Sequence, residues 1–541
     1  MASISFSVQC QTVAPRSFHE VLGEADASTL SVWRGPAYAG AAQPTVVGSG
    51  YALALISDGA AVRTLVQPTA SDLARASEPE RPVRPGTPVA SVGHQPHLPK
   101  IGQAWRKLAQ DAAARSDAER LAAFTAAMGL ELPLTLISGG FGPHTPAVAV
   151  VPERMYVEYA GQAWSITHHV DASGAVQNHA TLSSSTSRSA DPAPCSTDAA
   201  ARASEAAMPE AGATAPRMDP TPMCAPSGIS RESGKMTPTQ WQAAVQNLVS
   251  DLKRGMAEKA VLARDINLVG SHIDSRFLAH RLAEQYPTCW VFAVAGLQGA
   301  SPEMLASVRD RQVRSRVLAG TCPPGEGAAL MRSRKNREEH RLAVQSVVAA
   351  LQEVAGEVHA PQVPFLLELP NVTHLASDVV ASLPGTTLAG AGPRAGSEHA
   401  PELAGAGSRA GSAHAPELAG AGPHTGTARV SQPVGLWNVV SALHPSAAVC
   451  GTPTQAAYEL IVKHESTERG RYSGPVGWMD ARGAGACAIA LRCGQLTPDG
   501  QAMQVVAGGG IMPDSQPDLE LAETEAKLAP VLTALGLAKP L

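Results

Sequence analysis

Three charged residues near the C-terminal end share one face of a predicted helix. Glu520, Glu523 and Lys527 stand at positions i, i+3 and i+7, a spacing that lines side chains up along a helix. Two acids at a helix start also complement its partial positive charge, and from spacing alone this is the simpler interpretation. The preceding run Gly508–Gly510 ends a predicted strand, where free backbone N–H groups could cradle a substrate carboxylate.

Three further charged positions have an ordinary interpretation when each is taken alone. Lys259 begins an apolar strand, where a lysine usually extends to solvent, although a lysine held in a site can lose its proton and act as a base. Glu303 follows Pro302, as turn and cap residues often do. Residues 337–341 resemble a solvated charged helix face. Spacing therefore does not decide the function of any of them.

The elements that carry these residues alternate between strands and helices. Thr237–Gln240 is a capping box with proline at the first helical position. Short apolar runs separated by turns predict strands, and 3.6-residue periodicity predicts helices. We expect helices over 118–128, 238–253, 275–285, 336–358 and 518–537, and strands over 50–56, 132–137, 147–151, 259–264, 290–294, 314–318, 474–479, 487–493 and 503–507. Many strands in hairpin succession with interspersed helices predict an α+β fold built on antiparallel sheets.

Two segments of low complexity divide the sequence. Residues 178–228 contain almost no large apolar side chain, and residues 385–430 contain a repeat of Leu388–Glu402 as Leu403–Glu417. Neither segment can bury enough apolar surface to offset its ordering entropy, so both are predicted to be disordered insertions. They separate three blocks, 1–177, 229–384 and 431–541, which together would form one fold.

Composition excludes several classes of partner. The 541 residues carry a net charge of −5 without a basic cluster, which gives no reason to expect nucleic acid or a membrane surface. No run approaches the ~18 apolar residues of a membrane span, and the N-terminus lacks the pattern of a secretory signal. A cytoplasmic protein is therefore expected.

Taken together and in order, nine motifs resemble the chorismate-utilising enzymes. Within them, the motifs are most similar to the isochorismate synthases of menaquinone and siderophore biosynthesis. The resemblance is dense from about residue 259 to 537 and weaker over 1–177. The motifs are Lys259–Arg264, Gly299–Leu305, Leu318–Thr321, Arg337–His340, His374–Ser377, Leu443–Pro445 with Gly451–Pro453, Gly474–Trp478, Leu491–Cys493 and Glu520–Thr524.

This resemblance implies a fold and a metal. The family fold is a single large α+β domain of two stacked antiparallel sheets with surrounding helices and an active-site cleft. By motif match, Glu339 and Glu523 would be direct Mg²⁺ ligands, and Glu520 would act through water. Carboxylates with retained waters suit this hard cation, which gives up water reluctantly.

The resemblance also implies a substrate and a pair of catalytic groups. The substrate would be chorismate, held by Gly320, Tyr472, Arg492, Gly508 and Lys527. Lys259 would activate the water that attacks the ring, and Glu303 would protonate the departing hydroxyl. A magnesium-dependent, reversible isomerisation to isochorismate is thus expected, with no obligate glutaminase partner.

Three other functions remain open, and four positions depart from the family pattern. Anthranilate and aminodeoxychorismate synthases share the scaffold but usually lack a lysine at the position of Lys259. Salicylate synthases keep both Lys259 and Glu303 and go on to release pyruvate. A catalytically decayed chorismate-binding protein is the third alternative. It rests on departures from the usual family residues at Asn336, Ala484 and Ala486, and Pro324 is a further departure.

Overall fold

The computed structural model describes residues 5–36, 43–58, 61–77, 97–143, 145–171, 222–270, 272–384 and 434–537. The predicted insertion 385–430 lies outside the described residues, as does the predicted insertion 178–228 up to residue 221. Residues 222–228 of that predicted insertion are described by the structure. The amide of Cys224 donates to Oδ2 of Asp274 (3.3 Å), which ties this stretch to the start of a helix.

Antiparallel strands make up the framework of the described chain. Each strand pairs with at least one neighbour, and every pairing is antiparallel. The strands are β1 (Ser5–Val13), β2 (Ser31–Arg34), β3 (Thr45–Ser57), β4 (Val62–Val66), β5 (Thr135–Ser138), β6 (Ala147–Tyr159), β7 (Gln162–Asp171), β8 (Ser230–Ser233), β9 (Lys259–Val269), β10 (Trp290–Val294), β11 (Leu297–Ser301), β12 (Met304–Arg309), β13 (Gln312–Cys322), β14 (Val358–His359), β15 (Phe365–Glu368), β16 (Thr373–Ser382), β17 (Gly451–Thr452), β18 (Pro475–Met479), β19 (Gly485–Ile489), β20 (Cys493–Leu496) and β21 (Ala502–Ile511).

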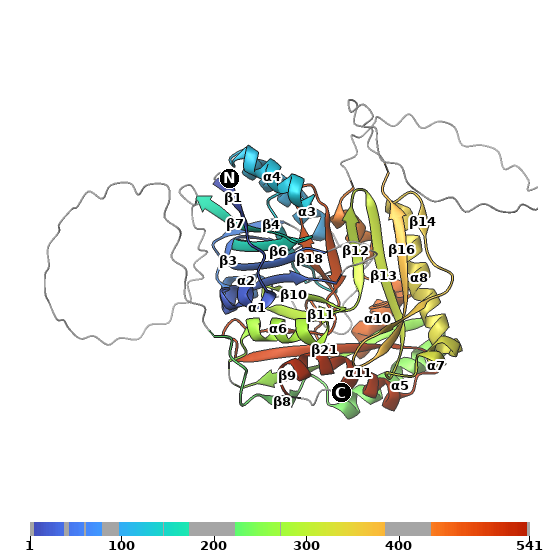
Figure 1. Ribbon diagram of the computed structural model, residues 1–541. Helices are drawn as coiled ribbons and strands as arrows, with labels where there is room; N and C mark the ends of the chain where they lie inside the picture. The colour runs from blue at the N-terminus through green and yellow to red at the C-terminus, as the bar shows by residue number, and fades with distance from the viewer. Residues whose placement is uncertain are drawn as a thin grey trace, which may run out of the picture.

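Helices surround these strands. They are α1 (Phe18–Gly23), α2 (Ala70–Ser77), α3 (His97–Ala113), α4 (Ala118–Met128), α5 (Pro238–Lys253), α6 (Ser275–Gln285), α7 (Gly327–Arg332), α8 (Arg334–Val354), α9 (Leu436–Leu443), α10 (Thr454–His464) and α11 (Pro517–Ala534). Helix α8 packs on β13 and β16, and α11 packs on β21 (Figure 1). Among the described residues, no helix combines the length and apolarity needed to cross a membrane.

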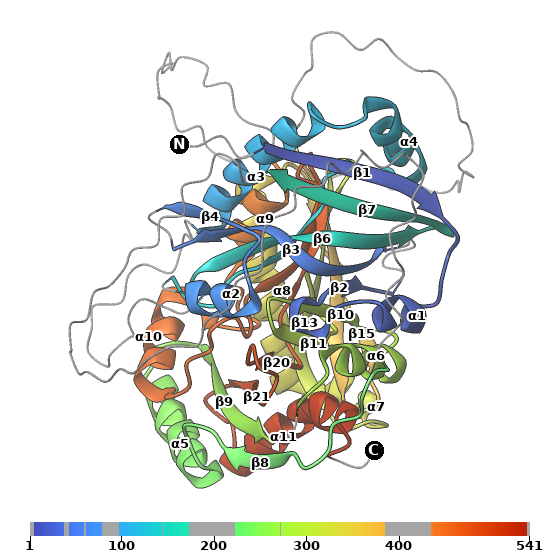
Figure 2. The same cartoon turned by 90° about the vertical axis from the view of Figure 1, so that its left-hand side faces the viewer.

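The long pair β3–β6 joins two sheet arms. One arm continues from β6 through β5, β18, β19, β12 and β13 to β16. The other continues from β3 through β2, β10, β11, β20 and β21 to β9. Figure 2 shows β3, β6, β7 and β1 on the upper part of the molecule and β9 and β21 below them. The α+β fold class of antiparallel sheets with surrounding helices is thereby confirmed.

All three sequence blocks contribute to the same buried core. One cluster contains Leu55 and Ile137 from the first block, Leu262 and Met304 from the second, and Val476 from the third. The site elements therefore rest on packing that joins segments far apart in the chain.

Most predicted elements are confirmed, and the errors are local. The structure reproduces the predicted helix α4, the predicted helix α6 and the Thr237–Gln240 capping box of α5. The helix expected over 336–358 ends at Val354, because residues 358–359 pair with β16 as a strand. The single strand expected over 487–493 is wrong: β19 ends at Ile489 and β20 starts at Cys493.

Candidate active site

A cleft lies between the two arms. It encloses about 670 Å³ of empty space, including its open mouth. Strands β9 and β21 contribute to one side, and β13 and β16 to the other. Of the predicted site residues, those that line the cleft are Glu303, Gly320, Glu339, Tyr472, Arg492, Gly508, Glu523 and Lys527. Lys259 and Glu520 are not part of this lining, although Lys259 contacts Glu339, which is.

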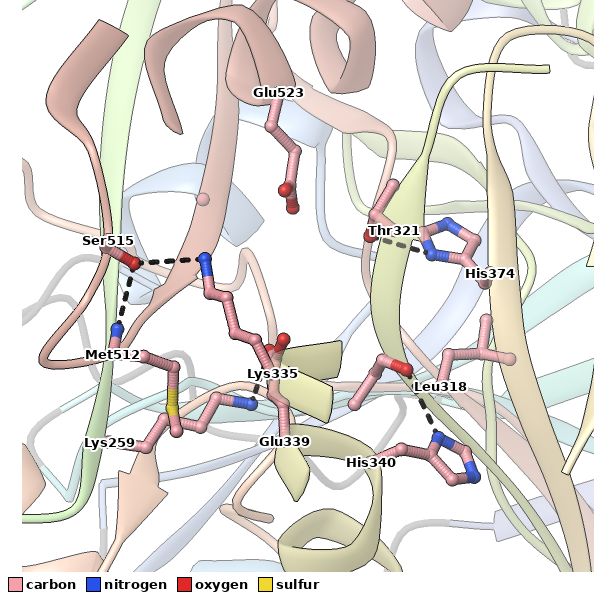
Figure 3. Close-up of polar contacts among 12 residues, drawn as sticks. Lys259, Leu318, Thr321, Lys335, Glu339, His340, His374, Met512, Ser515 and Glu523 are labelled. Atoms are coloured by element: carbon pink, nitrogen blue, oxygen red, sulfur yellow. Dashed lines mark hydrogen bonds and ion pairs between the residues drawn. The ribbon is translucent and has the colours of Figure 1, made fainter. Parts of the chain in front are cut away.

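Lys259 is held at the start of β9 against a carboxylate of helix α8. Its side chain is 1% exposed, and Nζ lies 2.9 Å from Oε1 of Glu339 (Figure 3). Strand β9 is buried on both faces near its start, so the lysine does not reach solvent. The neighbouring His340 fixes the helix, with Nε2 2.8 Å from Oγ of Ser377 and Nδ1 3.2 Å from the carbonyl of Ala319.

The glycine run lies inside a strand instead of ending one, which corrects the sequence interpretation. Gly508, Gly509 and Gly510 pair with β9 throughout. A Cβ on Gly510 would overlap Oε1 of Glu339 and lie 2.8 Å from Cε of Lys259. Glycine therefore lets the lysine–glutamate pair lie directly against the backbone.

The strand geometry also orients one backbone group of this run. Ala263, which pairs with Gly508, donates its amide to Glu465 (2.7 Å), away from β21. Antiparallel pairs alternate between bonded and non-bonded, so the polar backbone groups of Gly508 face away from β9 as well. Its carbonyl accepts a hydrogen bond from Lys527 (2.9 Å), and its amide faces the cleft on the same edge.

Helix α11 brings two more carboxylates to the glycine run. Glu523 contacts Nζ of Lys527, and Glu520 Oε1 lies 3.2 Å from Nζ of Lys335. We call Lys259, Lys335, Lys527, Glu339, Glu520 and Glu523 the carboxylate–lysine cluster. Burial, followed by the charge of Glu523, raises the pKa of Glu520. Burial acts in the same direction on Glu523, but Lys527, Arg492 and Lys335 together outweigh it and lower the pKa of that carboxyl.

The donor chemistry of this cluster fits a hard cation. Its three acids offer only carboxylate oxygens, and each is balanced by one lysine. Within the described ranges, no three His, Cys, Asp or Glu side chains lie close enough together to form a ready metal cluster. The carboxylates would therefore have to exchange lysine contacts for metal contacts.

Across the cleft, Glu303 is buried, and no cationic side chain among the described residues forms an ion pair with it. It follows β11 and is 4% exposed, with Oε1 3.4 Å from the amide of Leu318. Burial raises its pKa to about 8, despite that amide and the more distant charges of Lys259, Lys527 and Arg492. Glu303 therefore holds a proton at neutral pH, as a general acid requires.

Arg492 lies in the gap between β19 and β20 and has a left-handed backbone conformation (φ 51°). One guanidinium nitrogen is 2.9 Å from Nε2 of His374, whose Nδ1 is 3.1 Å from Oγ1 of Thr321. Burial, followed by the charge of Arg492, lowers the pKa of His374 well below its usual value, so the ring is neutral. We call Glu303, Thr321, His374 and Arg492 the Glu303–Arg492 side.

A second guanidinium nitrogen of Arg492 is the most informative atom of the cleft. Nη1 is buried and has no hydrogen-bond partner among the described residues. A buried charged donor without a partner is costly, and a ligand carboxylate would satisfy it. Arg492 is thus a candidate anchor for an anionic ligand.

Two predicted substrate-binding residues shape the cleft through the backbone or through burial. Gly320 has φ +82° at a bulge between β13 and β16, a conformation that glycine adopts without strain. Tyr472 is buried, and burial raises the pKa of its hydroxyl. Both line the cleft, as does His374 beside them.

The four departures from the family pattern leave the cleft lining intact. Asn336 donates from Nδ2 to Oγ of Ser333 (2.9 Å) in the first turn of α8. The amide of Ala484 bonds to Asp480 (2.9 Å) in a hairpin turn, and Ala486 is buried in β19. Pro324 lies in an exposed turn before α7. The cleft lining includes none of the four.

Sequence reasoning missed Lys335 and assigned no role to His374 or Thr321. The signal for the last two was present, since both stand in motifs. Lys335 had no separate signal, because its partners Glu520 and Ser515 are about 180 residues away in the chain.

A buried acid, a guanidinium with one nitrogen unpartnered among the described residues, and paired carboxylates lie around one cleft, an arrangement suited to a small carboxylated molecule. Comparison with known proteins identifies the family of this chain. The profile of the family described as chorismate binding enzyme matches residues 178–389 and 425–536, more than half of the chain. The chain belongs to this family.

Two relatives illustrate the similarity in sequence. The putative isochorismate synthase MenF of Mycobacterium tuberculosis is 34% identical over 303 residues, which cover 52% of this chain and 69% of that protein. The isochorismate synthase DhbC of Bacillus subtilis is 29% identical over 320 residues, 56% of this chain and 68% of that protein.

The fold has a counterpart among solved structures. The menaquinone-specific isochorismate synthase MenF of Escherichia coli superimposes with a TM-score of 0.60 at 17% identity, covering 99% of this chain and 95% of that one. At this identity, the likeness establishes the shared fold.

Proposed function

We propose that this protein is an isochorismate synthase, which converts chorismate reversibly to isochorismate. The observation that carries the proposal is the placement of Glu303, a buried acid with a pKa of about 8, in the cleft that also holds the unpartnered Nη1 of Arg492. The relatives named isochorismate synthases support the choice of reaction.

Binding would use the cationic and backbone donors of the cleft. Chorismate carries two carboxylates. Arg492 offers its unpartnered Nη1 to one of them, while Lys527 and the amide of Gly508 offer donors on the β21 side. Gly320, which has no side chain, would leave space for the ring, and Tyr472 would line that space. Two separated anchoring points would fix which ring carbon faces each catalytic group.

The reaction would place a base and an acid at different ring positions. Lys259, in its uncharged form, would accept a proton from the water that adds to one ring carbon, while the double bonds shift and the original hydroxyl leaves another carbon. Glu303 gives that hydroxyl its proton, so it departs as water. One water is consumed and one is released, which makes the change an isomerisation. Acid and base exchange roles in the reverse direction.

Magnesium is part of the proposal. Glu339 and Glu523 would bind the ion directly, and Glu520 would bind through water, because a set of carboxylate oxygens suits this cation. Bound there, Mg²⁺ supplies positive charge for a substrate carboxylate. Since the reaction uses water and not ammonia, a glutaminase partner is not required. We also propose that the protein acts in the cytoplasm.

Purified protein incubated with chorismate and Mg²⁺ tests this function by chromatography of the products. Isochorismate as the main product is expected. Salicylate with pyruvate would reassign the protein as a salicylate synthase. Anthranilate formed only with added ammonia would indicate an amination enzyme. No consumption of chorismate would leave a binding protein that has lost catalysis.

A further inference from the structure

Lys335 is the feature that the proposed reaction leaves unused. It stands in the first turn of α8, four residues before Glu339, and its ammonium reaches across to the start of α11. There it lies 3.2 Å from Oε1 of Glu520 and 3.4 Å from Oγ of Ser515. Ser515 in turn accepts a hydrogen bond from the amide of Met512 (3.0 Å; Figure 3).

The three lysines of the carboxylate–lysine cluster differ in how firmly they are held. Lys259 is 1% exposed and sealed behind the cleft, and Lys527 is 16% exposed and also bonds to the Gly508 carbonyl. Lys335 is 32% exposed, and both of its hydrogen bonds exceed 3 Å. A lysine on a flexible four-carbon stem that already touches solvent can withdraw at low cost.

A divalent cation and the Lys335 ammonium need the same negative charge. The charges of Glu520, Glu339 and Asp514 all act on Lys335. A cation placed among Glu339, Glu520 and Glu523 would add two positive charges beside this ammonium, and the repulsion would be reduced if Lys335 turned outward.

We infer that Lys335 is a displaceable internal counter-ion of the Mg²⁺ site, which occupies Glu520 until the metal arrives and lowers the affinity of the site for Mg²⁺. The inference rests on the proposed function, because it takes the three carboxylates as the metal site. It makes Lys335 a residue that sets metal affinity without touching the substrate. Turnover at saturating Mg²⁺ therefore does not depend on it.

Calorimetric titration of the full-length protein with MgCl₂ tests this inference. Lys335→Gln removes the competing charge and is expected to tighten Mg²⁺ binding about tenfold, the scale of a unit charge acting on a divalent ion a few ångströms away in water. The Mg²⁺ concentration for half-maximal turnover should fall in parallel, while kcat at saturating Mg²⁺ stays within twofold. Lys335→Arg keeps the charge and should bind Mg²⁺ as the wild-type protein does.

Arg337→Gln is the matched control. It removes the same charge from the same helix at an exposed position and should change Mg²⁺ affinity less than twofold. Weaker or unchanged Mg²⁺ binding in Lys335→Gln would overturn the inference. Weaker binding would show instead that Lys335 positions Glu520 for the metal. Wild-type protein that binds no Mg²⁺ would overturn it as well. The product assay judges the proposed function separately, since isochorismate can form whatever the effect of Lys335.

Discussion

The two sides of the cleft handle charge in opposite ways. In the carboxylate–lysine cluster, every acid contacts the amino group of a lysine. On the Glu303–Arg492 side, burial dominates: Glu303 is protonated, His374 is neutral, and Nη1 of Arg492 has no partner among the described residues. Pairing with lysines keeps the carboxylates of the cluster available as ligands for a cation. On the other side, burial keeps a proton on Glu303 and leaves Nη1 of Arg492 as an unsatisfied donor. The candidate metal ligands therefore lie in the carboxylate–lysine cluster, and the candidate proton donor, Glu303, lies on the Glu303–Arg492 side.

The largest expected effect comes from removing a carboxylate charge from the carboxylate–lysine cluster. Glu339→Gln or Glu523→Gln should abolish Mg²⁺-dependent turnover, because each keeps the shape of the side chain and removes a ligand charge. Steady-state assays over a range of Mg²⁺ concentrations measure the loss, and circular dichroism checks the fold. Glu338→Gln is the matched control: it lies on the same helix and pairs only at the surface with Arg341. Normal turnover of either ligand variant at limiting Mg²⁺ would refute the assignment.

Removing one catalytic group from each side should give the next largest effect. Lys259→Ala and Glu303→Gln should each lower kcat at least about a hundredfold, the scale of general acid–base catalysis. Substrate affinity should change much less, since Arg492 and Lys527 remain. Both variants must be impaired from chorismate and from isochorismate, because acid and base exchange roles. A Lys259→Ala enzyme with near wild-type rate in either direction would contradict the mechanism.

Substitutions in the glycine run Gly508–Gly510 test the carboxylate–lysine cluster more finely. Gly510→Ala places a methyl group against Glu339 and Lys259, and a displacement of about 1 Å there should cost ten- to a hundredfold in kcat/KM. Gly509→Ala is the matched control, because its Cβ would lie 3.5 Å from Oε2 of Glu520, an ordinary contact. Equal losses in the two variants would show that backbone freedom, and not space for the pair, explains the glycines.

The smallest expected effect is a pH dependence that tests the Glu303–Arg492 side. Glu303 carries its proton below its pKa of about 8 and loses it above. On the basic side of pH 8, the rate from chorismate should therefore fall by up to tenfold per unit. The pH profile of kcat/KM measures this limb. Glu303→Gln should lose the limb, and a variant that keeps it would assign the titration to another group.

The sequence predicted local elements better than it predicted interruptions. Helix α6 follows from its apolar period and from the Asp274 cap, both of which are local properties. The break before β20 was missed because residues 487–493 are apolar apart from Arg492, and the positive φ of Arg492 is not visible in the sequence. The run Gly508–Gly510 was taken as a strand end, since a sequence does not show which side chains pack against a backbone.

The residues of the candidate site likewise fall into those that the sequence predicted and those that it did not. Motifs in order brought Lys259, Glu303, Glu339 and Glu523 to attention, and the structure gathers them around one cleft or against its lining. The proton held by Glu303 follows from burial, which no spacing reveals. Lys335 acquires its contacts only when α8 and α11 meet, so its position in the sequence carried no signal.

The pairing of β9 with β21 has a consequence for how the protein folds. Ala260 pairs with Ile511 and Val269 with Ala502, so this ladder closes a loop of more than two hundred residues. Contacts of such high sequence separation form late, since the loop entropy must be met before they contribute. Lys259 and the glycine run consequently meet near the end of the folding reaction. Recovery of ligand binding during refolding should therefore lag behind recovery of helical circular dichroism, and it would report completion of the native topology.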